Sequence, residues 1–196
     1  MKKYLFSVIL LTLGLLCLNC SKDSTGNLSD SELLSAGWEE FSARDYGTAR
    51  DYFAELAGRG ALLADAYCGL GWSRLYLGSL ALAIEDFEAA LNENPSTVTR
   101  NDILAGMCFG ADALGDPQAC IEFGGNVAPG WQFRYRTSLS FSDITLVRAA
   151  SYYALGDFAA SLTEVRLLDA SFSVNVNTVE GRAALAAKIE TLRGSV

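Results

Sequence analysis

The stretch GSLALAIEDFEAALNENP, Gly78 to Pro95, decides the fold, because its pattern also occurs one period earlier in the chain. Its apolar residues follow helical spacing, and a proline ends such a run by pushing the preceding residue out of the α region. When the surrounding segments are aligned, identical residues stand 34 positions apart in four pairs: Gly37 and Gly71, Trp38 and Trp72, Ala49 and Ala83, Phe53 and Phe87. A period of this length indicates stacked helix hairpins.

The second unit also carries a known repeat signature, W-x2-L-G-x2-Y…A-x3-F…P. The matching residues are Tyr67, Leu70, Gly71, Ala83, Phe87 and Pro95. The chain therefore resembles a tetratricopeptide repeat protein, with Arg74 at the usual Tyr position and Leu33 at the Trp position of the first unit. The resemblance implies an all-α fold, a right-handed superhelix of about four antiparallel helix hairpins with a C-terminal capping helix.

The predicted helical domain covers residues 29–196. We place its repeat units at about 30–60, 62–95, 101–127 and 142–169, an aromatic insertion at 124–142 and the capping helix at 177–193. Small residues such as Gly71 and Ala83 let the two helices of a hairpin approach closely, while Phe87 fills the space toward the next hairpin.

Both ends of this domain carry helix-start signals. Ser29 with Glu32, and Asn177 with Glu180, have the spacing of a capping box. The C-terminal run then places four apolar residues near one helical face: Val179, Leu185, Ile189 and Leu192. Such a helix would cover the apolar face that the last repeat leaves open.

The first residues read as an export signal. Lys2 and Lys3 precede an uncharged apolar run, which is short for a membrane span. The segment resembles a bacterial lipoprotein signal, which implies a signal peptide at 1–19, lipidation of Cys20 and a flexible tether at 20–28. An uncleaved anchor is the alternative. In lipoproteins that this chain resembles, a Ser after the lipidated Cys directs the protein to the outer membrane, so Ser21 predicts a periplasm-facing, outer-membrane anchor.

Composition excludes several function classes. The net charge is −8 with a pI near 4.5, which argues against a nucleic-acid partner, because binding phosphates requires clustered Lys and Arg. The chain has no His, which removes Ser-His-Asp and Cys-His catalysis and His-ligated zinc. We therefore expect no enzyme, no cofactor and no metal site. Asp65, Asp102 and Asp143 each fall near the start of a predicted helix and are interpreted as capping residues.

The resemblance also carries over a partner-binding groove lined by the first helix of each hairpin. The groove positions fall on Leu34, Trp38, Phe41, Cys68, Trp72, Leu75, Tyr76, Phe109, Asp112, Leu146 and Tyr153. The residues expected to bind a partner are the aromatic ones: Trp38, Phe41, Trp72, Tyr76, Phe109 and Tyr153. The alternative is that they pack between repeats, with Trp38 and Trp72 the most exposed. A family carboxylate clamp is not expected, since Leu34, Trp38, Cys68 and Trp72 replace its polar residues.

The insertion is a second candidate surface. Trp131, Phe133, Arg134, Tyr135 and Arg136 stand close together in an otherwise acidic chain. They either contact a partner or the membrane, or pack onto units three and four with the arginines paired to acidic residues.

Cys108 and Cys120 occupy the two close-approach positions of the third hairpin, so an exported protein could join them in a disulfide. The alternative is a pair of small buried side chains.

These features predict a non-enzymatic scaffold or adaptor, anchored by lipid at the bacterial cell envelope, whose aromatic groove binds a protein or peptide partner. A glycan-binding or small-ligand-binding lipoprotein that uses the same groove is the alternative.

Overall fold

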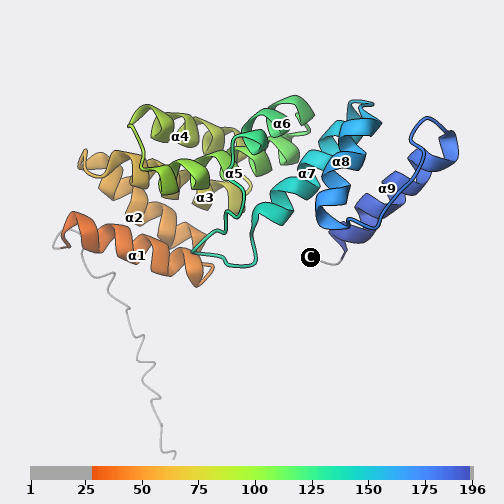
Figure 1. Cartoon of the computed structure of the whole chain (residues 1–196). Coiled ribbons are helices and arrows are strands. Elements are labelled where there is room, and N and C mark those ends of the chain that lie inside the picture. Colours follow the sequence, from red (N-terminus) through yellow and green to blue (C-terminus); the bar gives the residue numbers. More distant parts are fainter. Residues whose placement is uncertain (1–27, 195–196) are drawn as a thin grey trace, which may run out of the picture.

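The computed structural model describes residues 28–194, so the predicted signal peptide, Cys20 and most of the tether lie outside it. These residues fold into nine helices, which confirms the all-α prediction (Figure 1). The helices are α1 (Asp30–Ser42), α2 (Tyr46–Gly58), α3 (Leu63–Tyr76), α4 (Leu80–Asn92), α5 (Thr97–Leu114), α6 (Pro117–Gly125), α7 (Phe141–Ala154), α8 (Phe158–Leu168) and α9 (Val179–Arg193). Within the described residues no helix is both long and apolar enough to cross a bilayer.

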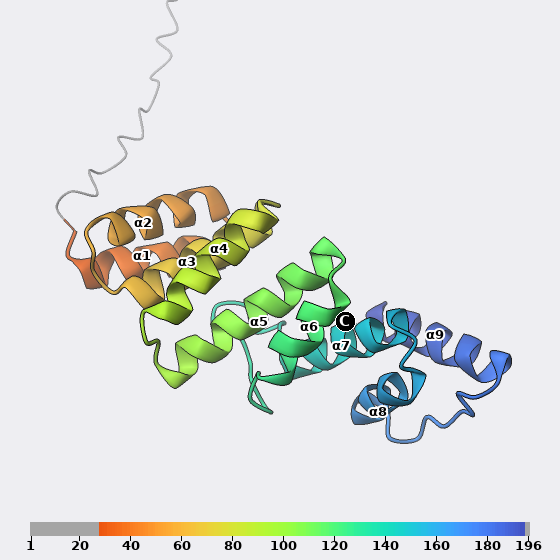
Figure 2. The same cartoon turned by 90° about the horizontal axis from the view of Figure 1, so that it is seen from above.

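Consecutive helices pair into four hairpins that stack in chain order (Figure 2). Each inner hairpin contacts both neighbours: α3, for example, packs against α1, α2, α4 and α5. The third hairpin begins at Thr97, earlier than the predicted 101, because the Ser96 side chain caps α5 by accepting from the Thr99 amide. The final helix, α9, packs against α7 and α8, as expected of a capping helix.

The turn inside each hairpin requires one residue in the left-handed region. In three hairpins that residue is a glycine: Gly78 (φ 77°), Gly115 (φ 73°) and Gly156 (φ 80°). In the first hairpin the same place is taken by Arg44, at φ 69°. A side chain in this conformation costs about 1 kcal/mol or more, since its Cβ crowds the following carbonyl oxygen. Arg44 is therefore held in a backbone conformation that its type disfavours.

Two phenylalanines interlock successive hairpins against glycines. Phe53 of α2 lies between Gly37 of α1 and Gly69 of α3, and a Cβ added at Gly69 would meet its ring at 2.5 Å. Phe87 of α4 lies in the same way against Gly71 of α3 and Gly106 of α5. The sequence predicted that the two phenylalanines fill the space toward the next hairpin, but it did not identify Gly69 and Gly106 as the residues that they meet there. Both phenylalanines are fully buried.

The predicted helix cap is present at the first helix of the domain but is shifted by one residue at the last. Ser29 and Glu32 form the predicted capping box at α1. At α9 the prediction was wrong by one residue, since Thr178 rather than Asn177 caps the helix by accepting from the Gly181 amide. Val179 is consequently turned outward and 75% exposed, while Leu185 and Ile189 are buried against the last hairpin.

The two cysteines of the third hairpin are buried thiols whose sulfur atoms lie 3.4 Å apart. The hydrogen bond that Cys108 shares with Cys120, together with burial, raises the pKa of the Cys108 thiol. Cys68, the third described cysteine, is also buried, and burial raises its pKa well above the usual value. The structure thus holds Cys108 and Cys120 as neighbours without a covalent bond.

Replacing Gly69 by alanine should destabilise the protein by about 1–3 kcal/mol, because its methyl group would overlap the ring of Phe53. Urea unfolding followed by circular dichroism measures this loss. The matched control is Gly58→Ala: Gly58 ends α2 with open space where a Cβ would go, so its stability should be unchanged or slightly higher. Equal losses at both positions would contradict the interlock.

A thiol titration of the unfolded, lipidated protein without reductant reports the state of the cysteine pair in the native envelope. With the Cys20 sulfur blocked by its lipid, three free thiols mean that Cys108 and Cys120 are reduced, as the structure has them. One free thiol would mean that export has closed a bond between them. The Cys108→Ser variant, which cannot form this bond, is the reference for counting.

Candidate functional site

The connection between α6 and α7 does not cross directly from one helix to the next. It passes beside α3 and α5 and reaches the C-terminal end of α1 (Figure 1). Residues 131–141, here called the aromatic segment, fold on themselves through backbone hydrogen bonds. The Phe133 amide donates to the Leu139 carbonyl at 2.9 Å, and the Phe141 amide donates to the Trp131 carbonyl at 2.8 Å. The segment therefore lies along the side of the superhelix where the partner-binding groove was predicted.

The aromatic segment stacks on the two tryptophans that repeat with a spacing of 34. The ring of Tyr135 lies parallel to that of Trp38, with centroids 3.8 Å apart and planes 2° apart. The ring of Phe133 stacks on Trp72, with centroids at 4.2 Å. Phe133 is fully buried and Trp131 is 8% exposed, so both belong to the main hydrophobic core.

A buried carboxylate holds the start of the segment in place. The indole Nε1 of Trp131 donates to Asp102 Oδ1 at 2.8 Å, and Arg134 approaches Oδ2 at 3.5 Å. Trp72 is tied to the same residue, because its indole donates to the Asp102 carbonyl at 3.1 Å. Burial raises the pKa of Asp102, while the hydrogen bonds from Trp131 and Arg134 oppose that rise. The carboxylate thus depends on the segment for its partners.

The two arginines of the segment are held by aromatic rings. Arg136 lies over the ring of Tyr76, 4.7 Å from its centroid, and donates to the Tyr46 hydroxyl at 2.9 Å. Arg134 lies 5.1 Å from the centroid of Tyr135. Burial raises the pKa of Tyr76, partly offset by the charge of Arg136. Of these two arginines, only Arg134 has an acidic partner among the described residues.

The predicted site residues are in part brought together, but not as an open groove. Trp38, Phe41 and Trp72 are buried, at 6%, 1% and 0% exposure, so the expectation that Trp38 and Trp72 are the most exposed was wrong. Their faces are covered by the chain's own aromatic segment. Tyr76 is half-buried and stacks on Tyr46.

The other predicted groove residues are divided between the two halves of the molecule. Phe109 is half-buried beside Trp72, with ring centroids at 6.2 Å. Tyr153 belongs to a separate cluster, where it contacts Phe158 and donates to the Arg182 carbonyl at 3.3 Å. Leu146 is buried in that same cluster, and Cys68 is buried in the main core.

The packing predicted for the insertion was wrong in its location. The segment lies mainly against the first two hairpins and Asp102 of the third rather than against units three and four. The reason is aromatic area: Trp38 and Trp72 offer large flat faces one hairpin step apart, onto which the rings of Tyr135 and Phe133 stack.

The three aspartates differ from one another. Asp143 accepts from the Ser140 amide in a capping box, so its capping role is confirmed. For Asp65 the capping prediction was wrong, because no side chain caps α3; Asp65 instead accepts from the Thr99 hydroxyl at 2.8 Å and so joins α3 to α5. For Asp102 the capping prediction was wrong, because α5 begins five residues earlier and the carboxylate is buried inside it.

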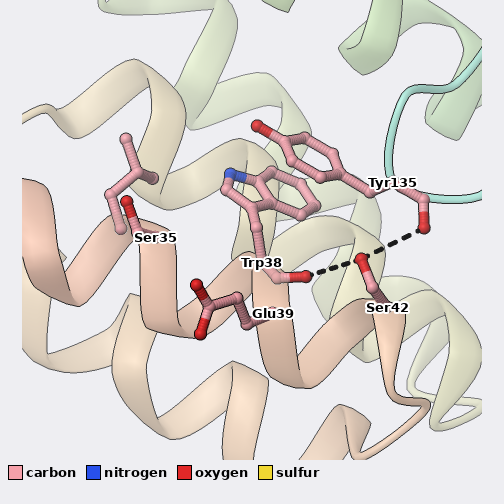
Figure 3. Close-up of a pocket in the computed structure, with 6 residues that line it drawn as sticks. Ser35, Trp38, Glu39, Ser42 and Tyr135 are labelled. Atoms are coloured by element: carbon pink, nitrogen blue, oxygen red, sulfur yellow. Dashed lines mark hydrogen bonds between the residues drawn. The ribbon is translucent and has the colours of Figure 1, made fainter.

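Two hollows remain open beside the segment. The first, here called the apolar recess, has a volume of about 450 Å³ and lies between α1 and the Trp38–Tyr135 stack (Figure 3). Its lining consists of Leu34, Ser35, Trp38, Glu39, Ser42 and Tyr135. At its end, the Ser42 hydroxyl lies between the Trp38 carbonyl at 2.8 Å and the Tyr135 carbonyl at 3.3 Å, as the dashed lines show.

The second hollow, here called the arginine pocket, has a volume of about 400 Å³. Three of its lining residues are arginines: Arg44, Arg134 and Arg136. Phe41, Tyr46 and four residues with hydroxyl or aromatic groups complete the lining, which contains no acidic residue. It adjoins the apolar recess, since Ser42 and Tyr135 line both hollows.

No family model, curated protein or solved structure matches this chain. The relation to tetratricopeptide repeat proteins therefore stays a prediction from the sequence. Within residues 28–194, no group of three or more Cys, Asp or Glu side chains is placed to hold a metal ion.

Sequence reasoning missed Arg44 and Asp102 as parts of this region. The signal for Arg44 was present, since it stands where Gly78, Gly115 and Gly156 occur in the other hairpins. No comparable signal marked Asp102, whose burial follows from the placement of Trp131 over it.

Replacing Trp131 by phenylalanine should lower stability by about 1.5–3 kcal/mol near neutral pH, because the Asp102 carboxylate loses a hydrogen-bond donor inside the core. That hydrogen bond lowers the carboxyl pKa, so the stability that it contributes is present where Asp102 is ionised and is lost as the pH falls through the pKa. Urea unfolding at a series of pH values from about 8 downward should show the loss shrinking as Asp102 becomes protonated. In an Asp102→Asn background the loss should shrink, and an undiminished loss there would contradict the pairing.

Proposed function

We propose that this protein is a non-enzymatic scaffold or adaptor, anchored by lipid at the bacterial cell envelope, that binds a protein or peptide partner. The observation that carries the proposal is the open apolar recess between α1 and the Trp38–Tyr135 stack, next to the arginine pocket. Apolar hollows with arginine and aromatic residues at their rim are typical of protein-binding surfaces.

We place the binding surface at the rim of the predicted groove rather than on its floor. The floor beneath Phe133 and Tyr135 is filled by the aromatic segment, whose release would expose Trp72 and leave Asp102 without two of its partners. A partner therefore meets α1 and the outer side of the segment. Ser35 and Glu39, both exposed on α1, stand at this entrance.

The proposed location of the protein in the cell envelope is inferred from its sequence. Lipidation of Cys20 would place the helical domain on a short tether, and Ser21 favours the outer membrane, facing the periplasm. Loss of residues 1–19 removes Lys2 and Lys3 and no acid, so the net charge of the mature chain is −10 instead of −8. A protein so anchored can gather soluble partners at the membrane surface.

The glycan-binding alternative has less support. Sugar rings stack on exposed aromatic faces, but all three tryptophans are at most 8% exposed. Trp38 is already stacked on Tyr135, and Trp72 and Trp131 are already stacked on Phe133.

A photoreactive amino acid at Ser35 should crosslink a partner protein in intact envelopes, because this position lines the entrance of the apolar recess. The same amino acid at Ala54, which is exposed on α2 and lines neither hollow, is the matched control. Crosslinked products are separated by electrophoresis and identified by mass spectrometry.

The expected result is a discrete adduct from position 35 that is absent from position 54 and is suppressed when Leu34 is replaced by glutamate in the same chain. Adducts of equal yield and identity from both positions would argue against a binding surface at the recess. Circular dichroism of each variant excludes unfolding as the cause.

A further inference from the structure

The arginine pocket stands out against the charge of the rest of the molecule. The chain has 23 acidic and 15 basic side chains, yet three of its arginines line this one hollow and no acid does. We propose that the arginine pocket binds a side-chain carboxylate of an acidic partner segment, while an apolar side chain beside that carboxylate enters the apolar recess. This inference rests on the proposed function and adds to it the chemistry of the partner.

The three guanidinium groups have donors to spare. A guanidinium carries five N–H donors. Arg136 gives one hydrogen bond, to the Tyr46 hydroxyl, and Arg134 one, to Asp102. For Arg44, no hydrogen bond or ion pair joins its side chain to any described residue. Carboxylates fit such donors well, since both groups are planar and pair through two parallel hydrogen bonds.

Two of the three arginines of the pocket are held in place before any ligand arrives. Arg136 is fixed by the Tyr76 ring and the Tyr46 hydroxyl, and Arg134 by the Tyr135 ring and Asp102. Rings that hold a guanidinium by its face leave the N–H groups at its edge free for an anion. Because these side chains are already ordered, binding costs less conformational entropy than it would on a mobile surface.

The backbone at Arg44 is an independent sign of function. The three equivalent turns use glycine, which adopts the left-handed conformation without strain, whereas Arg44 occupies it at φ 69°. A disfavoured conformation that persists at one of four equivalent positions points to a role for the side chain rather than for the turn. That side chain lines the arginine pocket.

The apolar recess beside the arginine pocket favours a peptide as the ligand. Its lining is mostly apolar, and it shares Ser42 and Tyr135 with the arginine pocket. A segment that carries an acidic residue next to an aromatic or aliphatic one would fill both hollows. An anionic membrane fits less well, because Trp131 and Phe133 are buried and cannot insert, and the net charge of the chain is negative.

The test uses the full lipidated chain in neutral detergent micelles, with its arginines labelled by nitrogen-15. The probes are acetyl-Ser-Phe-Glu-Ser-amide, its Gln counterpart and inorganic phosphate. The Glu peptide should shift the Nε–Hε resonances of Arg44 and Arg136 in a saturable way. The Gln peptide should bind about tenfold more weakly, since it lacks the charge. Added salt should weaken the binding of the Glu peptide and leave the binding of the Gln peptide almost unchanged.

Arg44→Gly separates recognition from folding. This variant should bind the Glu peptide about tenfold more weakly. The melting temperature of the protein should stay equal or rise, because glycine relieves the backbone strain. Arg44→Gln keeps a long side chain at the position and should show the same loss of affinity. The control Arg100→Gln removes one positive charge from an exposed position of α5 that lines neither hollow, and should leave the affinity unchanged.

Equal binding of the Glu and Gln peptides, or no shift at the arginines with either, would overturn the proposal. So would saturation by phosphate without a response to the Glu peptide, which would assign the pocket to phosphate groups instead. A partner that still crosslinks from position 35 in the Arg44→Gly variant with undiminished yield would leave the scaffold function standing and remove only the carboxylate site.

Discussion

The stacking of this protein depends on one contact that is made twice, a phenylalanine ring lying against glycines of two successive hairpins. Phe53 meets Gly37 and Gly69, and Phe87 meets Gly71 and Gly106. No side chain could replace these glycines without displacing a buried ring. The contact brings the first helices close together, and so places Trp38 and Trp72 on one side of the stack.

The two tryptophan faces are covered by the aromatic segment. Residues 133–136 form a turn, in which the Arg136 amide donates to the Phe133 carbonyl at 3.1 Å, and from this turn Phe133 stacks on Trp72 and Tyr135 on Trp38. The aromatic segment thereby becomes part of the core, while Arg134 and Arg136 stay at the rim of the filled groove. Under the function that we propose, a partner would meet a rim of defined shape and charge rather than an empty channel.

In the first hairpin, the carboxylate recognition that we propose would oppose the stability of the turn. Its turn would be less strained with glycine, as in the other three hairpins, but glycine would leave the arginine pocket with two cations instead of three. Asp102 represents a similar compromise in the core, where a buried carboxylate is retained because Trp131 and Arg134 compensate part of its desolvation. Arg44 lowers the stability of its turn, and the buried Asp102 carboxylate brings a desolvation cost to α5.

The sequence by itself determined the helices, their pairing and the close-approach positions that repeat, such as Gly37 and Gly71, because a period of 34 with small and aromatic residues at fixed positions is a local pattern. It also marked residues 131–136 as unusual. It did not determine where this segment packs, that Trp38 and Trp72 are covered, or that Asp102 lies inside α5. Those outcomes were decided by the tertiary structure, since a connection without repeat periodicity is placed by the surfaces available to it, and the faces of Trp38 and Trp72 belong to the first two hairpins, distant in sequence.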